Sequence, residues 1–244
     1  MDSLELVLLA IGGLFAGCVN AIAGGGSLLT VPLLVLVGIP GDVANGSNRL
    51  GILTSNLSAA TIFRRKGLSE LPEVVSVLVP VVAGSLCGSV LVSLVEAEFF
   101  ERAFGLVMVP LLLLSLRPLK VKEIAHSWSS PLTVGVFFCV GLYGGAFQAG
   151  IGLLLALALT RSGLDVVVAN SVKVLVILTV TLVALPVFIA RGLVDWGPAL
   201  VLATGFGVGG ALGARLTVGG GERLVRPVMV VAVLAMSGRL LDFY

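Results

Sequence analysis

The sequence contains few charged residues. Lys, Arg, Asp and Glu together make up 11% of the 244 residues, whereas hydrophobic residues make up 58%. Because a soluble domain carries about 25% charged residues, this shortage excludes an ordinary soluble fold and predicts a helical protein that crosses a lipid bilayer several times. The net charge is only +2, and no long basic tail indicates a nucleic-acid partner.

Residues for catalysis and metal binding are also scarce. The single histidine, His126, lies in a polar stretch, and no carboxylate pair, HExxH motif or Cys/His metal spacing occurs inside an apolar run. The three cysteines, Cys18, Cys87 and Cys139, lie in apolar runs and are odd in number, which argues against a disulfide framework. The sequence therefore predicts that the protein is not an enzyme and has no metal or cofactor.

The apolar run at residues 4–38 is interrupted by three consecutive glycines at 24–26, and it is too long for one span of about 20 residues. Each glycine destabilises a helix by about 1 kcal/mol relative to Ala, and it bares backbone groups that hydrocarbon cannot satisfy. Such a break is tolerated where it lines a cavity, and the helix that follows it can hold an anion at its N-terminus. The run predicts two short helices, 4–23 and 27–38, with a ligand site at the break.

The pattern of the first half returns in the second half, where a second glycine-rich break occupies residues 144–152. Shifting the first half by 125 or 126 residues superposes matching landmarks, namely Asn45 on Asn170, Gly67 on Gly192 and Gly24 on Gly150. Landmarks in one order at one spacing predict an internal duplication. Within one membrane domain, repeat 1 is expected at 1–116 and repeat 2 at 131–244, joined by a polar loop at 117–130.

The distribution of Lys and Arg predicts how the halves are oriented. Apart from Arg49 and Lys173, ten of these residues share one face and three lie on the other if each broken run is a hairpin that returns to the face it entered from. The split is eight to five if each run crosses once, so the positive-inside rule favours hairpins. Each half then has five segments, an odd number. The expected fold is an all-α polytopic membrane protein of two inverted repeats, each with a glycine-broken helical hairpin plus three spanning helices, and with both termini outside the cytoplasm.

Two cations lie inside predicted spans. Arg49 and Lys173 are each six or seven residues from the start of a span, where a charge costs at least about 2.5–3.5 kcal/mol and usually faces a cavity. One interpretation is that both balance the charge of a bound anion, and the other is that they extend toward lipid headgroups. Several neighbouring polar residues either cap helices or bind the same ligand. The expected substrate-binding residues are Gly24, Gly25, Gly26, Ser27, Asn45, Ser47, Asn48, Arg49, Gln148, Gly150, Asn170, Ser171 and Lys173.

The order of these motifs resembles a known family. The glycine break is followed by Pro32-Leu33-Leu34, Gly38-Ile39-Pro40, Ala44-Asn45-Gly46-Ser47-Asn48 and Arg65-Lys66-Gly67. This arrangement, which covers almost the whole chain, resembles the sulfite exporter family TauE/SafE. The resemblance implies an inner-membrane exporter of sulfite, thiosulfate, sulfoacetate or related anions. This sequence has Ser47 where members often carry Thr.

The residues and the resemblance together predict a secondary transporter. Its substrate would be a small sulfur-containing anion such as sulfite, thiosulfate or an organosulfonate, bound at the membrane midplane between the two broken hairpins. Three alternatives remain open at this point. They are a transporter or channel for another small anion, a membrane-embedded enzyme, and an assembly scaffold.

Overall fold

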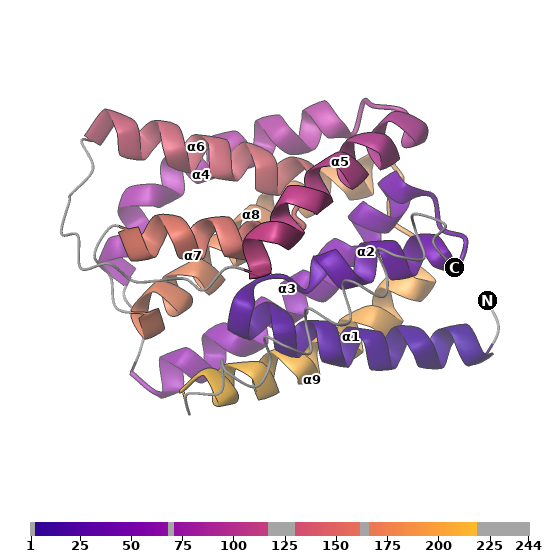
Figure 1. Cartoon of the computed structure of the whole chain (residues 1–244), viewed down its shortest axis with the longest axis horizontal. Helices are drawn as coiled ribbons and strands as arrows, with labels where there is room; N and C mark the ends of the chain where they lie inside the picture. The colour runs from indigo at the N-terminus through magenta and orange to yellow at the C-terminus, as the bar shows by residue number, and fades with distance from the viewer. Residues whose placement is uncertain (1–2, 68–70, 117–129, 162–165, 219–244) are drawn as a thin grey trace.

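The computed structural model describes residues 3–67, 71–116, 130–161 and 166–218. Within these ranges every regular element is an α-helix, as the composition predicts (Figure 1). The helices are α1 (Ser3–Ala23), α2 (Ser27–Leu36), α3 (Gly41–Arg65), α4 (Leu71–Val92), α5 (Ala97–Leu116), α6 (Ser130–Ala146), α7 (Ile151–Arg161), α8 (Val166–Ala190) and α9 (Trp196–Val218). The fifth segment expected in the second half, and most of the polar loop, lie outside the described residues.

Each glycine-rich break separates two helices that run in opposite directions (Figure 1). α1 ends at Ala23, and α2 begins at Ser27 and returns beside α1 toward the end of the molecule where the N-terminus lies. α6 ends at Ala146, and α7 begins at Ile151 and turns back in the same way. The two helices of the first hairpin differ in length, because α1 has 21 residues and α2 only 10. α1 matches the helix expected at 4–23 to within one residue, whereas α2 ends two residues before the expected 38.

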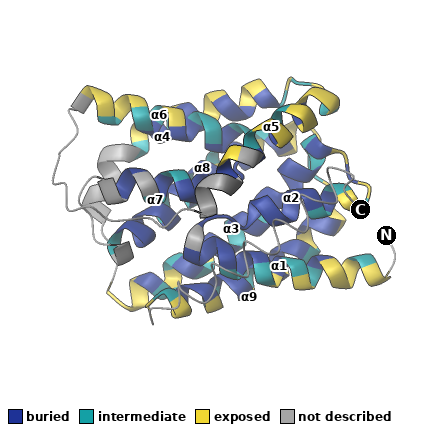
Figure 2. Cartoon of the chain, in the orientation of Figure 1, coloured by how far each residue is buried: buried dark blue, intermediate teal, exposed yellow. Residues whose placement is uncertain are grey.

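The described residues include three segments long and apolar enough to cross a membrane, namely Ser3–Ile22, Val168–Ala190 and Trp196–Val218. Large apolar side chains on the outer faces of α1 and α9 are exposed, for example Ile11 and Leu200, which suits contact with lipid (Figure 2). α3 has 25 residues but a more polar sequence. Its polar residues face inward, because Asn45, Ser47, Asn48 and Arg49 are all buried.

Two helix pairs pack with their backbones in close contact, and glycine makes both contacts possible. α1 lies along α9, where a Cβ on Gly17 would be 2.5 Å from the Phe206 carbonyl oxygen. α4 lies along α6, where a Cβ on Gly84 would be 2.1 Å from the Phe138 carbonyl oxygen. Small residues allow such approach in membrane helices. In each pair, the first helix of one predicted half packs on the fourth helix of the other half: α1 on α9, and α6 on α4. The two pairs are therefore equivalent under the predicted repeat.

The backbone conformation repeats at positions that the sequence shifts align. Gly24 and Gly150 follow the first helix of each half and have φ of 77° and 71°. Gly67 and Gly192 follow the third helix of each half, with φ of 72° and 71°. Glycine takes this left-handed conformation at the ends of helices without steric cost. Gly67 and Gly192 therefore follow the third helices in the same conformation, and Gly24 and Gly150 share it within the two breaks.

α3 and α8 run antiparallel through the centre of the molecule (Figure 1). Arg49 of α3 lies over the ring of Phe188 in α8, with its guanidinium carbon 4.2 Å from the ring centroid. Fourteen residues further along α3, Phe63 shares a small buried cluster with Val174 of α8. The Arg49–Phe188 contact and the shared cluster are consistent with one antiparallel register for the central pair.

Candidate functional site

The two glycine-rich breaks touch one another. A Cβ placed on Gly24 would lie 2.3 Å from the Cα of Gly152, and a Cβ on Gly152 would lie 2.2 Å from the Cα of Gly24. Only glycine at both positions permits this contact, since real Cβ atoms essentially never approach so closely. The fold thus brings together the two segments that the sequence predicts as halves of one site.

Helix N-termini with free donors meet at this contact. The backbone N–H groups of Gly25, Gly26 and Ser27, at the start of α2, donate to no described residue, and Gly26 has no side-chain cap. The N–H groups of Gly150 and Gly152, at the start of α7, likewise have no acceptor among the described residues. Such N-termini carry partial positive charge and are suited to an anion.

Two asparagines bind the helix ends that precede the breaks. Asn45 Nδ2 donates to the carbonyl oxygen of Ala146, 2.8 Å away, at the C-terminus of α6. Asn170 Nδ2 donates to the carbonyl oxygen of Ala21, 3.1 Å away, near the C-terminus of α1. The shift of 125 residues relates both the donors and the acceptors of these bonds. Each half therefore holds the broken helix of the other half through an equivalent bond.

The two buried cations bind the same helix ends. Arg49 donates to the carbonyl oxygens of Gly144, Gly145 and Ala146, with Nη1 3.3 Å from Gly144 O. Lys173 Nζ lies 3.4 Å from the carbonyl oxygen of Ala21 and 3.3 Å from that of Ile22. Helix C-termini carry partial negative charge, so both contacts are favourable.

Neither cation reaches the surface, because Arg49 is 0% exposed and Lys173 is 1% exposed. Among the described residues, the buried charged and polar side chains include no Asp or Glu. The cations therefore lie inside the protein next to the breaks, which is where the anion interpretation expects them. In this conformation, the contacts described for them are with helix carbonyl groups and, for Arg49, the Phe188 ring.

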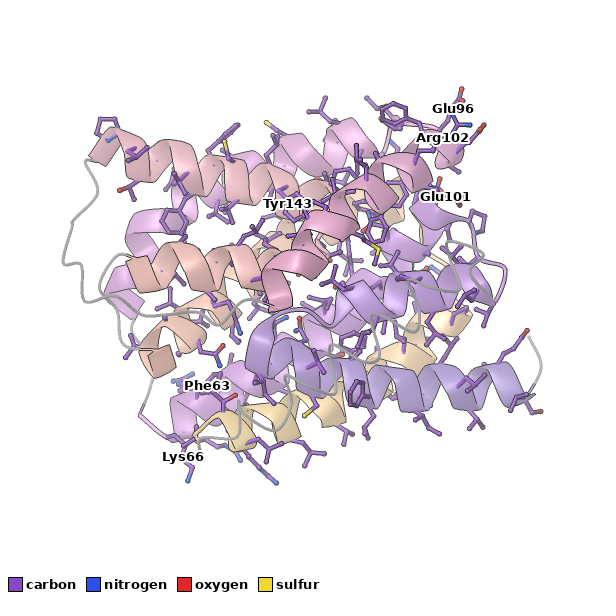
Figure 3. The ribbon with its side chains drawn as sticks, in the orientation of Figure 1. Phe63, Lys66, Glu96, Glu101, Arg102 and Tyr143 are labelled. Atoms are coloured by element: carbon purple, nitrogen blue, oxygen red, sulfur yellow. The ribbon has the colours of Figure 1, made fainter. Side chains whose placement is uncertain are left out.

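The second break is held by side chains on both sides. The Tyr143 hydroxyl of α6 donates to the carbonyl oxygen of Ala149 (Figure 3). Gln148 Nε2 donates to the hydroxyl of Thr181 in the middle of α8. Gln148 has φ of 60°, a left-handed conformation that costs a residue other than glycine of the order of 1 kcal/mol or more. Its side chain is thus directed into the protein at an energetic cost that the surrounding contacts offset.

Five buried side-chain atoms near the centre have no hydrogen-bond partner among the described residues. They are Asn45 Oδ1, Asn48 Nδ2, Arg49 Nε, Asn56 Oδ1 and Gln148 Oε1. A buried polar atom without a partner is unfavourable by about 1–3 kcal/mol and calls for an explanation. All five lie on α3 or in the second break, so the unsatisfied hydrogen-bonding capacity is concentrated beside the two glycine segments.

Other predicted residues make separate contacts. Asn48 Oδ1 is 2.6 Å from the hydroxyl of Thr30 in α2, so this asparagine lies beside the first hairpin. The Ser47 hydroxyl accepts the N–H of Asp195 at 2.8 Å, which ties α3 to the connection before α9. Ser27 and Ser171 are both 2% exposed. Ser47 is therefore the predicted site residue with a clear packing role.

Sequence reasoning missed three buried polar residues beside the breaks. Asn20 donates from Nδ2 to the hydroxyl of Ser55, 3.3 Å away, next to the first break. Asn56 and Thr181 are both 0% exposed and lie in the middle of α3 and α8. Asn56 could have been found as a polar residue two helical turns from Arg49, whereas a single Thr in an apolar span carries no comparable signal.

A cavity of about 210 Å³ lies away from the breaks, between α2, the start of α3 and α5. Its lining is mostly apolar, and the carboxylate of Glu101 accepts the N–H of Gly41 at 2.9 Å beside it. Glu101 lies near the end of the molecule that also carries Glu96 and Arg102 (Figure 3). A carboxylate among apolar side chains does not suit an anion, so the breaks remain the candidate substrate site.

The chain is similar to known membrane proteins over most of its length. Residues 9–240 match the family described as sulfite exporter TauE/SafE. A "probable membrane transporter protein" of Haemophilus influenzae is 29% identical over 244 residues, covering 96% of this chain and 94% of that protein. The "probable membrane transporter protein YfcA" of Escherichia coli K12 is 30% identical over 232 residues, covering 93% of this chain and 86% of that protein. With its apolar helices and this match, the chain belongs to the sulfite exporter TauE/SafE family of membrane transporters.

Proposed function

We propose that the protein is a secondary transporter that exports a small sulfur-containing anion across the inner membrane. The observation that carries this proposal is the meeting of two helix N-termini at the Gly24–Gly152 contact, where several N–H groups have no acceptor in the described part of the chain. Anion oxygens would accept hydrogen bonds from these N–H groups and from Ser27. Arg49 and Lys173 would supply positive charge from the adjacent helix ends. Sulfur as the central atom, and export as the direction, rest on the family.

We also propose that the two halves are inverted repeats and that transport moves one hairpin relative to the other. The helix pairs α1–α9 and α4–α6, equivalent under the predicted repeat, support this, as do the equivalent Asn45 and Asn170 bonds. The alternative of a channel-like conductance is less well supported. Gly24 and Gly152 are in backbone contact, so an anion cannot pass between them in this conformation. No catalytic step is proposed.

Anion-dependent stabilisation of the purified protein tests the proposal. The unfolding temperature in detergent would be measured with sulfite, thiosulfate, sulfate and ethanesulfonate, and with acetate at matched ionic strength as the control. A ligand at 100 times its Kd stabilises the folded state by about 2.7 kcal/mol, so at least one sulfur anion is expected to raise the unfolding temperature in a saturable way.

Efflux from proteoliposomes loaded with the stabilising anion completes the test. Release that saturates with substrate concentration is expected, since a transporter must change conformation for each anion moved. Absence of stabilisation by every sulfur anion, together with absence of efflux, would reject the proposal. Release that stays linear at high concentration would favour the channel instead.

A further inference from the structure

Two buried amide oxygens, one on α3 and one in the second break, have no donor among the described residues, and the hydrogen-bond network identifies both as acceptors. Asn56 Nδ2 donates to the carbonyl oxygen of Ile52, 2.8 Å away, so Oδ1 is the remaining amide atom. Thr181 donates its only hydroxyl proton to the carbonyl oxygen of Ile177 at 2.7 Å. Its oxygen can therefore only accept from Gln148, which makes Gln148 Nε2 the donor and leaves Oε1 unpaired. Exchanging N and O in either amide would place two acceptors together.

The register of α3 and α8 brings these two amides to one place. Arg49 of α3 lies over the ring of Phe188 in α8. Fourteen residues further along these antiparallel helices, Phe63 and Val174 belong to one buried cluster, which also includes residues of α1 and α9. Seven residues from Arg49 and from Phe188, this register places Asn56 on α3 and Thr181 on α8 at the same level. Seven residues are about two helical turns, so these two residues lie on the same helix faces as Arg49 and Phe188.

Gln148 is hydrogen-bonded to Thr181 and is thereby directed to the same level. Asn56 is 0% exposed and Gln148 is 1% exposed, so bulk water does not satisfy their oxygens. Gln148 also precedes Gly150 and Gly152 in the second break by only two and four residues. The acceptor pair therefore lies next to the N–H groups that are proposed to bind the anion.

We infer that Asn56 and Gln148 form a subsite for a hydrogen-bond donor on the transported anion, an inference that rests on the proposed function. The substrate class is then a monovalent sulfur oxyanion that carries an O–H or N–H group, such as hydrogen sulfite. Its negatively charged oxygens face the helix N-termini, and its donor faces Asn56 Oδ1 and Gln148 Oε1. Thr181 is a positioning residue, since it holds the Gln148 amide in this orientation.

This subsite discriminates among anions because an anion without a hydrogen-bond donor leaves the oxygens of Asn56 and Gln148 without a partner. A site built to hydrogen-bond a substrate donor rejects analogues that lack it, because buried polar groups then lose their partner. Sulfate and thiosulfate, fully deprotonated at neutral pH, offer no donor. Hydrogen sulfite loses its donor when it is deprotonated, so its binding should weaken as the pH rises through its pKa.

Sulfamate and methanesulfonate provide a matched pair of probes. Both are monovalent at neutral pH and have three sulfonate oxygens, but sulfamate carries an NH₂ donor where methanesulfonate carries a methyl group. The Kd of each would be measured by calorimetry on the full-length protein in detergent. The wild type is expected to bind sulfamate at least about tenfold more tightly.

Two variants and one control test whether the Asn56 and Gln148 oxygens cause the preference for sulfamate over methanesulfonate. Asn56→Leu removes one acceptor and is expected to reduce the ratio of the two Kd values to within about threefold. Ser85→Ala is the control, because Ser85 is also buried beside α8 and donates to the Val180 carbonyl oxygen at 3.0 Å but contributes no unpaired atom. It is expected to keep the ratio. Thr181→Val, which frees the Gln148 amide, is expected to lower the ratio with little effect on methanesulfonate.

The outcomes separate this inference from the proposed function. Equal binding of both probes by the wild type would overturn the donor subsite while leaving anion transport intact. Sodium-dependent anion binding that Asn56→Leu abolishes, without a sulfamate preference, would also overturn it and assign the two oxygens to a cation. Failure of every sulfur anion to bind would reject the proposed function and the subsite together.

Discussion

At the residue scale, the two buried cations are held by hydrogen bonds to the C-terminal ends of helices. A cation inside a membrane protein is unfavourable unless polar groups surround it, and the C-terminus of a helix presents several carbonyl groups that lack partners within the helix. Arg49 binds those of α6, and Lys173 binds those of α1. Because each cation belongs to one half and each helix end to the other, the bonds also hold the two halves together.

Replacing Arg49 tests this contribution. Arg49→Gln removes the charge and most of the carbonyl contacts, and hydrogen bonds of a charged group contribute about 1.5–3 kcal/mol. The free energy of unfolding, measured by titration with SDS, is expected to fall by that order. Arg49→Lys should recover part of the loss and most of the anion affinity, because it keeps the charge without the planar donor geometry.

Arg64→Gln is the matched control, since Arg64 lies on the same helix but is exposed at its end. It should change the free energy of unfolding by less than about 0.5 kcal/mol. An Arg49→Gln variant as stable as the Arg64→Gln variant would show that the helix-end bonds contribute little. Unchanged anion affinity in Arg49→Gln would assign that residue a purely structural role.

At the scale of elements, the two hairpins contact each other at their glycine-rich breaks, next to the short helices α2 and α7. α2 and α7 have 10 and 11 residues, so most of their stability must come from packing against α3 and α8. The breaks in front of them meet through Gly24 and Gly152 with no side chain between. A contact made of backbone alone can separate and reform without repacking side chains, which suits a segment that has to move during transport.

The variant Gly152→Ala tests the contact between the breaks. Gly152 does not have a positive φ, so the substitution adds a methyl group without backbone strain, and its Cβ would lie 2.2 Å from Gly24 Cα. The hairpins must shift apart, and efflux from proteoliposomes is expected to fall at least about tenfold while the protein still inserts and folds. Gly135→Ala in α6 is the control, because no atom lies within 4 Å of its added Cβ. Efflux by Gly152→Ala at the rate of Gly135→Ala would contradict the assignment of the site.

At the scale of the whole molecule, the charges gather at its two ends. Arg64, Arg65 and Lys66 lie at the end of α3, and Lys66 is at the opposite end of the molecule from Glu96 and Arg102 (Figure 3). Arg215 lies in the last turn of α9, and this end of α9 lies at the same end of the molecule as the end of α3 (Figure 1). The positive-inside rule favours the end with more Lys and Arg in the cytoplasm. The N-terminal end of α1 would then face outward.

Cysteine labelling in intact cells tests this orientation. In a background where Cys18, Cys87 and Cys139 are replaced by Ala, a cysteine at Glu96 should react with a thiol reagent that does not cross the membrane. A cysteine at Lys66 should react only after the cells are opened. Labelling of Lys66→Cys in intact cells, with Glu96→Cys protected, would reverse the proposed topology.

The agreement between sequence and structure is closest where the signal is local. Three consecutive glycines destabilise a helix by about 1 kcal/mol each relative to Ala, and this local signal allowed the end of α1 and the start of α2 to be predicted to the residue. The repeated spacing located the second break less exactly, at 144–152, because α6 continues to Ala146 and α7 already begins at Ile151. The length of α2 was overestimated by two residues, because the apolar pattern continues past Leu36 into the turn at Gly38.

Composition and local pattern by themselves determined that this chain is a helical membrane protein, that it is broken at two places, and that two cations, Arg49 and Lys173, lie inside its apolar segments. Only the tertiary structure decided that Gly24 meets Gly152, that Arg49 and Lys173 bind the helix ends of the opposite half, and that Gln148 binds Thr181. The physical reason is that a helix end offers backbone carbonyl groups, which every residue type has, so no sequence pattern marks which side chain will bind them. Such contacts depend on how the helices cross, and that is set by glycine-mediated packing between segments far apart in the chain.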